Sequence, residues 1–404
     1  MNIRSLILVL IFFSMISSFK TTYAQWKVCN HGVRIGYPTC MISDSNNIYY
    51  SGDIDGIFIS SDNGNSWLSK NDGINKADGY NYHIQTLAIN GNNLFAGTWL
   101  NGIFLSTNKG DNWMRKSNGL PLDTTLTNTN QFVYSIVIDG GNIWAGTDWG
   151  VFLSTNNGDS WTQKNKGFLD TTITSIAVTG NNIFAGTRSG AIYLSTDNGD
   201  NWSVKNIALG SPVDPIIING NDIIVGTTDD GLYISADNGD SWTHKFDWEI
   251  SDMTSLVIYK NNILFAATEQ GGVAISIDYG DTWNEINDGI TDWDEGRLTI
   301  KDNYIYYGSY SGLIFKAKLD DLITDVKENE QNNKTIITPN PASDFLNIHS
   351  SDLIGKEITI YDMLGNKIKT VIAESMDSCI NIESLSMGIY LIRIGEFTKI
   401  FIKE

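Results

Sequence analysis

Three aspartates lie in short polar segments where they could act as catalytic carboxylates. Asp148 precedes Trp149-Gly150, and Asp229-Asp230 precede Gly231. Two carboxyl groups placed about 5–9.5 Å apart across a glycosidic bond can hydrolyse it, one of them as the acid. Such a reaction requires the two groups to have different pKa values, and nothing in the sequence separates those values. Catalysis by Asp148 with Asp229 or Asp230 therefore remains one hypothesis among several.

Large aromatic side chains occur in the same class of segment as these aspartates. Aromatic faces pack on the C–H faces of sugar rings or on a peptide, while carboxylates and guanidinium groups bind the polar rim. In the alternative interpretation the rings only pack neighbouring loops and the acids are solvated. The candidate ligand-binding residues are Trp99, Asp148, Trp149, Arg188, Asp230, Trp248, Glu269 and Trp293.

The elements that position these residues come from an internal repeat. Six octapeptides align, each beginning with Ser and ending with Trp, and their tryptophans recur every 40 to 48 residues. A period near 40 is typical of a four-stranded propeller blade. The octapeptides are Ser60–Trp67, Ser106–Trp113, Ser154–Trp161, Ser195–Trp202, Ser235–Trp242 and Ser276–Trp283.

Each repeat contains three strand-like runs before the octapeptide and one after it, which we name A to D from the axis outward. A seventh A-B-C set at residues 298–316 has no octapeptide after it, whereas the segment beginning Gln25-Trp26 matches the D pattern of Ser160-Trp161. We therefore expect Trp26 to belong to an N-terminal strand that completes the last blade and closes the ring, which removes an exposed edge. The prediction is an all-β, seven-bladed propeller over residues 25–318.

A propeller of this kind has one repetitive face and one variable face. The octapeptides join strands C and D, and Asn/Gly hairpins join A and B, so both emerge on the repetitive face. The B–C and D–A loops differ from blade to blade and emerge on the opposite face, which we call the variable-loop face. All the candidate ligand-binding residues fall in these loops, so we expect them to surround one mouth.

The octapeptides resemble the Asp-box, or BNR repeat, of sialidases, sortilin-type receptors, xyloglucan-hydrolase-like propellers and photosystem assembly factors. Asn108 and Asn156 depart from that pattern, which usually has Asp. The Ser and Asp or Asn oxygens of the octapeptides can accept hydrogen bonds from backbone amides of the turn, and the Trp side chain can pack between sheets. We therefore expect the octapeptides to have a structural role. The residues concerned are Asp62, Trp67, Asn108, Trp113, Asn156, Trp161, Asp197, Trp202, Asp237, Trp242, Asp278 and Trp283.

Composition and charge exclude several partners. The chain of 404 residues has a formal net charge of −19, which repels nucleic acid. Three cysteines and four histidines show no metal-type spacing, so no metal or other cofactor is expected. No segment of the mature chain has the length of a membrane helix, and we expect a monomer.

The two ends of the chain have separate patterns. Residues 1–24 have the basic start, short apolar run and final Ala24 of a secretory signal peptide. Residues 319–334 are polar and acidic, which predicts a linker. Residues 335–404 contain six strand-like runs, which predict a small Ig-like β-sandwich.

The order PNPASDFLNI, IYDMLGNKI, MGIYLIRI and IFIKE resembles the type A C-terminal sorting domain of Bacteroidota type IX secretion substrates. The resemblance implies that the type IX machinery is a partner through residues 335–404 and that the protein is secreted or attached to the outer-membrane surface. An ordinary Ig-like module is the alternative.

Three classes of function follow from these features. The preferred hypothesis is non-catalytic recognition of a glycan or protein on the variable-loop face. The second is a glycoside hydrolase, either xyloglucanase-like or sialidase-like; a sialidase needs an arginine triad, for which Arg34, Arg188 and Arg297 are the residues on that face. The third is a scaffold in a cell-surface layer.

Overall fold

The computed structural model describes residues 25–30, 36–76, 81–121, 132–206, 209, 211–245, 252–351, 353–395 and 397–404. The predicted signal peptide at 1–24, Arg34 and Trp248 lie outside these residues. The chain divides into two compact units, Met1–Leu319 and Asp320–Glu404.

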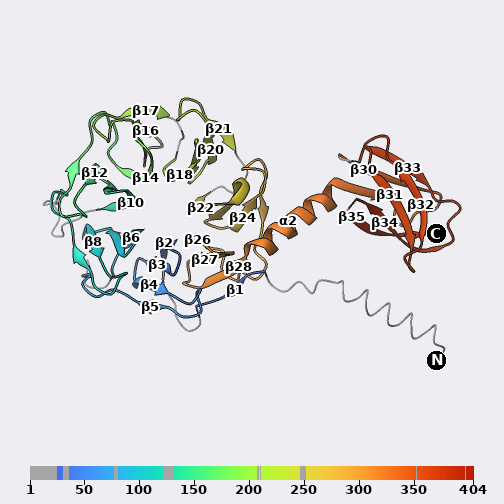
Figure 1. Cartoon of the computed structure of the whole chain (residues 1–404), viewed down its shortest axis with the longest axis horizontal. Helices are drawn as coiled ribbons and strands as arrows, with labels where there is room; N and C mark the ends of the chain where they lie inside the picture. The colour runs from blue at the N-terminus through green and yellow to red at the C-terminus, as the bar shows by residue number, and fades with distance from the viewer. Residues whose placement is uncertain are drawn as a thin grey trace. The chain divides into compact units, whose positions relative to one another are not determined.

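Seven four-stranded antiparallel sheets form the described part of the first unit, and Figure 1 shows them arranged around a ring. They begin with β2–β5 (Pro38–Ser43, Ile48–Gly52, Gly56–Ser60, Leu68–Ser69), β6–β9 (Ile84–Asn90, Asn93–Thr98, Ile103–Ser106, Met114–Arg115), β10–β13 (Val133–Asp139, Asn142–Thr147, Gly150–Ser154, Thr162–Gln163) and β14–β17 (Ile173–Thr179, Asn182–Thr187, Ile192–Ser195, Ser203–Asn206). They continue with β18–β21 (Val213–Asn219, Asp222–Thr227, Gly231–Ser235, Thr243–Lys245) and β22–β25 (Met253–Tyr259, Ile263–Thr268, Gly272–Ser276, Asn284–Glu285), where the 3-10 turn η2 (Lys260–Asn262) joins β22 to β23. The last sheet contains β26 (Arg297–Lys301), β27 (Tyr304–Gly308), β28 (Ile314–Lys318) and β1 (Lys27–Val28).

The hydrophobic core of this unit lies between neighbouring sheets. One buried cluster joins Tyr49 and Ile57 of the β2–β5 sheet to Leu87 and Phe104 of the next sheet. The second strand of each sheet is buried along almost its whole length, which explains its nearly continuous run of apolar and small residues. This arrangement confirms the predicted all-β fold.

The N-terminal strand occupies the outermost position of the last sheet. β1 pairs with β28 in antiparallel register, Lys27 opposite Lys316. Trp26 is 1% exposed, and its indole N–H donates to the carbonyl oxygen of Ile286 in the preceding sheet. Trp113, Trp161 and Trp202 donate in the same way to the preceding sheet, so Trp26 takes the place of the missing octapeptide tryptophan.

The six octapeptides form turns with one hydrogen-bond pattern. In the fourth turn, the Ser195 hydroxyl donates to Asp197 Oδ1 over 2.9 Å and accepts from the Gly199 N–H over 2.9 Å. Asp197 Oδ1 also accepts the N–H of Asn201. Asn108 and Asn156 supply the same acceptor oxygen in their own turns, which explains why Asn can replace Asp there.

These turns predict a specific acid sensitivity. Hydrogen bonds from Asn201 and Ser241 lower the pKa values of Asp197 and Asp237 to about 2. Because these values lie below those of an unfolded chain, the two carboxylates stabilise the fold above about pH 4, and this stabilisation is lost as the pH falls towards 2. The double substitution Asp197→Asn/Asp237→Asn should lower the thermal midpoint at pH 6 and lower it much less at pH 2. A variant that differs equally from the unsubstituted protein at both pH values would contradict this assignment.

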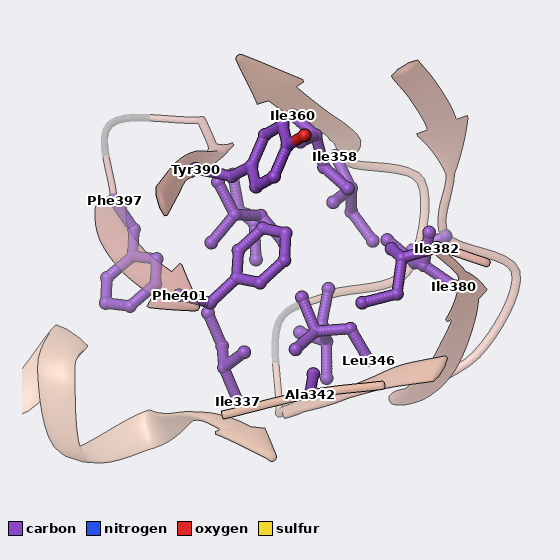
Figure 2. Close-up of a cluster of buried hydrophobic side chains, with 14 of the residues drawn as sticks. Ile337, Ala342, Leu346, Ile358, Ile360, Ile380, Ile382, Tyr390, Phe397 and Phe401 are labelled. Atoms are coloured by element: carbon purple, nitrogen blue, oxygen red, sulfur yellow. The ribbon is translucent and has the colours of Figure 1, made fainter. Parts of the chain in front are cut away.

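The second unit is built from two antiparallel sheets around one apolar core. One sheet has the order β29-β30-β33 and the other β32-β31-β34-β35. Figure 2 shows Leu346 and Ile380 of the first sheet and Ile360, Tyr390 and Phe401 of the second directed into this core. The strands are β29 (Thr335–Thr338), β30 (Phe345–Ser350), β31 (Glu357–Asp362), β32 (Lys367–Ile372), β33 (Asp377–Asn381), β34 (Gly388–Ile394) and β35 (Phe397–Lys403).

The segment predicted as an acidic linker is helical. Residues 319–334 form α2 (Leu319–Lys334). Leu319, Leu322, Ile323 and Val326 have the i, i+3, i+4, i+7 spacing of a helix face, and all four are buried. The acidic composition obscured this stripe in the sequence. No helix of the described residues is long and apolar enough to cross a membrane.

Candidate ligand-binding face

A cavity of about 720 Å³ lies among the innermost strands of the ring. Each of β2, β6, β10, β14, β18, β22 and β26 contributes to its lining, and Figure 1 shows these strands nearest the centre. Cavities of several hundred Å³ are of the size that holds small ligands or a protein side chain. The cavity therefore defines the centre of the candidate site.

A β-bulge near the start of each of six inner strands directs a side chain to the cavity. The register of each strand shifts there by one residue relative to its neighbour. A β-bulge leaves one extra residue outside the ladder of interstrand hydrogen bonds and changes the direction of its side chain. Because each inner strand starts at a D–A loop, these residues lie at the end of the cavity nearest the variable-loop face. The bulge ring comprises Thr39, Gln85, Tyr134, Thr174, Asp214 and Thr254, and all six line the cavity.

A chain of rings crosses the variable-loop face beside this cavity. We call His83, Trp99, Phe132 and Tyr134 the aromatic arc. The ring centroids lie 5.8 Å apart for His83 and Trp99, 5.6 Å for Trp99 and Phe132, and 6.4 Å for Phe132 and Tyr134. Trp99 is 41% exposed, so part of the arc faces solvent. His83 is buried and Phe132 and Tyr134 are half-buried, so Trp99 is the main exposed ring of the arc.

Charged groups fix both ends of the arc. At one end, His83 Nδ1 lies 2.7 Å from Asp53 Oδ1. At the other, the Arg188 guanidinium packs over the Tyr134 ring and donates to its hydroxyl over 3.0 Å. These contacts hold the rings in one geometry before any ligand arrives, which lowers the entropy cost of binding.

The predicted catalytic residue Asp148 belongs to this second end. Tyr134 donates its hydroxyl proton to Asp148 Oδ1 over 2.9 Å. Burial raises the pKa of Asp148, an effect that the Tyr134 hydrogen bond and the Arg188 charge partly oppose. Burial also raises the pKa of Tyr134 to about 12, so the phenol remains a donor. The structure thus brings together Asp148 and Arg188, two of the predicted ligand-binding residues.

The other two candidate catalytic residues have their own surroundings. Asp230 accepts a hydrogen bond from Tyr233 on β20, and its carboxylate is 3.8 Å from His244 Nε2 on β21. β21 is the outermost strand of its sheet, so these contacts hold Asp230 away from the axis. The backbone N–H of Asp229 donates to the Ser211 hydroxyl. Asp148 and Asp230 therefore have separate sets of partners.

The remaining predicted ligand-binding residues lie at separate points of the face. Trp149 is 43% exposed and borders, with Phe132, a cavity of only about 10 Å³, too small for a ligand. Trp293 is 52% exposed, with its indole N–H donated to the carbonyl oxygen of Ile290. Glu269 is exposed, and its backbone pairs with those of Asp252 and Glu295.

Several site residues were missed because they lie on strands. Phe132, Tyr134, Gln85 and Asp214 precede or belong to inner strands, which the sequence analysis treated only as structure. Arg297, considered only as a member of an arginine triad, also lines the cavity; its Nε donates to the Thr39 carbonyl oxygen over 2.9 Å. The repeated apolar-polar-small start of these strands, as in Ile84-Gln85-Thr86, was the available signal.

The fold and its second unit define a β-propeller followed by a small two-sheet domain. A family described as a secretion system C-terminal sorting domain matches residues 336–404. A second family, described as the DUF6242 beta propeller domain, matches residues 136–253. A comparison with curated proteins found no match. The first match supports export of the chain by type IX secretion, to the cell surface or the medium.

Solved structures similar to this chain are propellers with low sequence identity. PorZ of Porphyromonas gingivalis, an essential surface component of its type IX secretion system, is 15% identical with a TM-score of 0.56 over 92% of this chain and 60% of PorZ. YCF48 of Cyanidioschyzon merolae is 14% identical with a TM-score of 0.55 over 74% and 100%. A GH74 xyloglucanase of Xanthomonas campestris is 18% identical with a TM-score of 0.54 over 71% and 44%. The chain thus spans about three fifths of PorZ and less than half of the xyloglucanase, and these likenesses show the fold alone.

Proposed function

We propose that this protein is an exported recognition propeller that binds a glycan or protein ligand on its variable-loop face without transforming it. The aromatic arc beside the central cavity carries the proposal, because its pre-positioned rings and polar rim suit a ligand with apolar and hydrogen-bonding faces. The proposal includes seven blades, Asp-box turns at the six octapeptides, and delivery by the type IX machinery after removal of a signal peptide.

The partners of Asp148 favour binding over catalysis. A glycosidase needs a second carboxylate facing the first across the scissile bond. The described groups that contact or charge-couple to the Asp148 carboxylate are Tyr134 and Arg188, whereas Asp230 is held by residues of β20 and β21. Hydrolysis remains the alternative function, supported by the raised pKa of Asp148, which is the property of a general acid.

Substitution of Trp99 tests the proposal. Glycan and peptide arrays would first identify a ligand of the full chain. Trp99→Ala should then weaken binding by about 30-fold or more, the loss expected for an aromatic hot spot. Met114→Ala is the matched control, because Met114 is 55% exposed on β9, the outermost strand of the same sheet, and is remote from the arc.

The same ligand separates binding from hydrolysis. Binding without turnover, weakened by Trp99→Ala and unaffected by Met114→Ala, supports recognition. Turnover of a glycan that Asp148→Asn abolishes while binding persists would establish the hydrolase instead. If neither array yields a ligand sensitive to Trp99→Ala, the proposed recognition surface is wrong.

A further inference from the structure

Asp214 of the bulge ring has a carboxylate without a partner in the cavity. Its side chain is exposed to the cavity space, and the cavity walls surround it. Among the residues that the structure describes, none donates a hydrogen bond or forms an ion pair with this carboxylate. Desolvation by the cavity walls raises the pKa of Asp214 to about 6, an effect that the charge of Arg297 partly opposes. A carboxylate that is desolvated without a hydrogen-bond donor is less stable in its charged form.

The two arginines that line the cavity have carboxylates of their own. Arg297 lies 3.4 Å from Glu295 and is held to the backbone of β2 by its Nε. Arg188 packs on Tyr134 and is electrostatically coupled to Asp148. Burial raises the pKa of the Cys40 thiol to about 11, so this lining group is neutral at pH 7. Arg297 is also electrostatically coupled to Asp214 and offsets part of its charge, but no described cation forms an ion pair with that carboxylate.

The threonines on either side of Asp214 present acceptors rather than donors. Thr174 on β14 donates its hydroxyl proton to the carbonyl oxygen of Val213, next to Asp214. Thr254 on β22 donates to the carbonyl oxygen of Gly296. A hydroxyl whose proton is already donated retains only its acceptor lone pairs. The β14, β18 and β22 part of the bulge ring is therefore rich in acceptors, with one carboxylate at its centre.

We propose that this part of the cavity binds a protonated primary amine, with Asp214 as the counter-ion and the Thr174 and Thr254 hydroxyl oxygens as further acceptors. An ammonium group has three donors and no acceptor, which matches this set. The cavity of about 720 Å³ admits a lysine side chain or a small free amine. The net charge of −19 also favours the approach of a cation.

This inference rests on the proposed function for the location of the ligand. It adds the chemical group that the central cavity would bind. The amine has two possible sources, a lysyl side chain of a protein or a free amine. The probes are acetyl-Gly-Lys-Gly-amide and cadaverine, each matched by a neutral partner, acetyl-Gly-norleucyl-Gly-amide and 1,5-pentanediol. Calorimetric titration of the full chain at pH 7.5 should detect at least one amine probe and neither neutral partner.

Asp214→Asn should weaken amine binding by about tenfold or more, as expected for loss of a charge-assisted hydrogen bond. Asp240→Asn is the matched control, since it removes the same charge from an octapeptide turn of the same sheet on the repetitive face. Binding to the unsubstituted protein should also fall as the pH drops through about 6, because protonation of Asp214 removes its charge while the amines stay protonated. Asp214→Asn should raise the thermal midpoint at pH 7.5, which shows that the variant is folded.

The outcomes separate the sources and the two proposals. Binding of the lysyl peptide alone identifies a protein side chain, and binding of cadaverine as well identifies amines in general. The inference would be overturned if a neutral partner binds as well as its amine, or if neither amine binds. It would also be overturned if the Asp214→Asn and Asp240→Asn variants have equal affinities for the amine. Trp99→Ala should leave amine binding unchanged, so failure of the aromatic arc and failure of the amine site are distinguishable.

Discussion

Trp26→Ala is expected to lower the free energy of unfolding by about 3–5 kcal/mol, the cost of truncating a fully buried tryptophan. The indole is 1% exposed, packs edge-on against Tyr307 with centroids 6.3 Å apart, and donates to the Ile286 carbonyl oxygen. Its removal leaves a cavity and an unpaired carbonyl where the last two sheets meet. Chemical denaturation followed by tryptophan fluorescence and circular dichroism would measure the change.

Val28→Ala is the matched control, because Val28 lies in the same two-residue strand and is 39% exposed. It should change the stability by well under 1 kcal/mol. If Trp26→Ala and Val28→Ala unfold at the same denaturant concentration, then the Trp26 indole does not stabilise the closure of the ring. Both substitutions retain the backbone N–H and C=O groups of β1, so the comparison isolates the indole.

The closing strand was predictable because it follows a local pattern that the repeat shows six more times. The short spacing from Trp26 to Asn30 matches that from Trp67 to Asn71, and both asparagines receive a backbone N–H from the neighbouring strand. One position of the N-terminal segment departs from the pattern of the β2–β5 sheet. Cys29 stands where Lys70 stands in its own sheet, and it is buried between sheets instead of forming an ion pair with a turn aspartate.

The aromatic arc could not be predicted in the same way. Trp99, His83 and Phe132 come from different sheets or loops, and their contacts depend on how adjacent sheets pack. Trp99 and Arg188 were predicted as ligand-binding residues from loop composition, but no local pattern says that Phe132 and Tyr134 join them. Ring-to-ring contact between sheets is a property of tertiary packing, which a single sequence does not encode locally.

The bulge ring was only partly predictable from the sequence. Its residues recur at the same position of six repeats, so the pattern was visible in the sequence. A regular strand without a bulge would have placed these side chains in the normal in-out alternation of the sheet. A bulge shifts the side chains by one position and places Asp214 in the cavity. Strand assignment alone therefore predicts the fold correctly and still misplaces the residues at its centre.

Phe401→Ala is expected to prevent export while leaving the propeller folded. Phe401 is 0% exposed, stacks on Tyr390 with centroids 5.6 Å apart, and lies in the core that joins both sheets of the second unit (Figure 2). Its truncation costs about 3–5 kcal/mol, which is comparable to the whole stability of a domain of this size. A sorting domain that is mostly unfolded cannot present the surface that the secretion machinery recognises.

Immunoblots of cell fractions would measure the effect, with the variant expected to accumulate inside the cell and to be lost from the surface and the medium. Thr398→Ala is the control, since Thr398 lies on the same strand with an exposed side chain. Export of the Phe401→Ala variant at the level of the control would contradict a role for the folded second unit. Because the two units have separate cores, the thermal transition of the propeller should be the same in both variants, which ties any loss of export to residues 336–404.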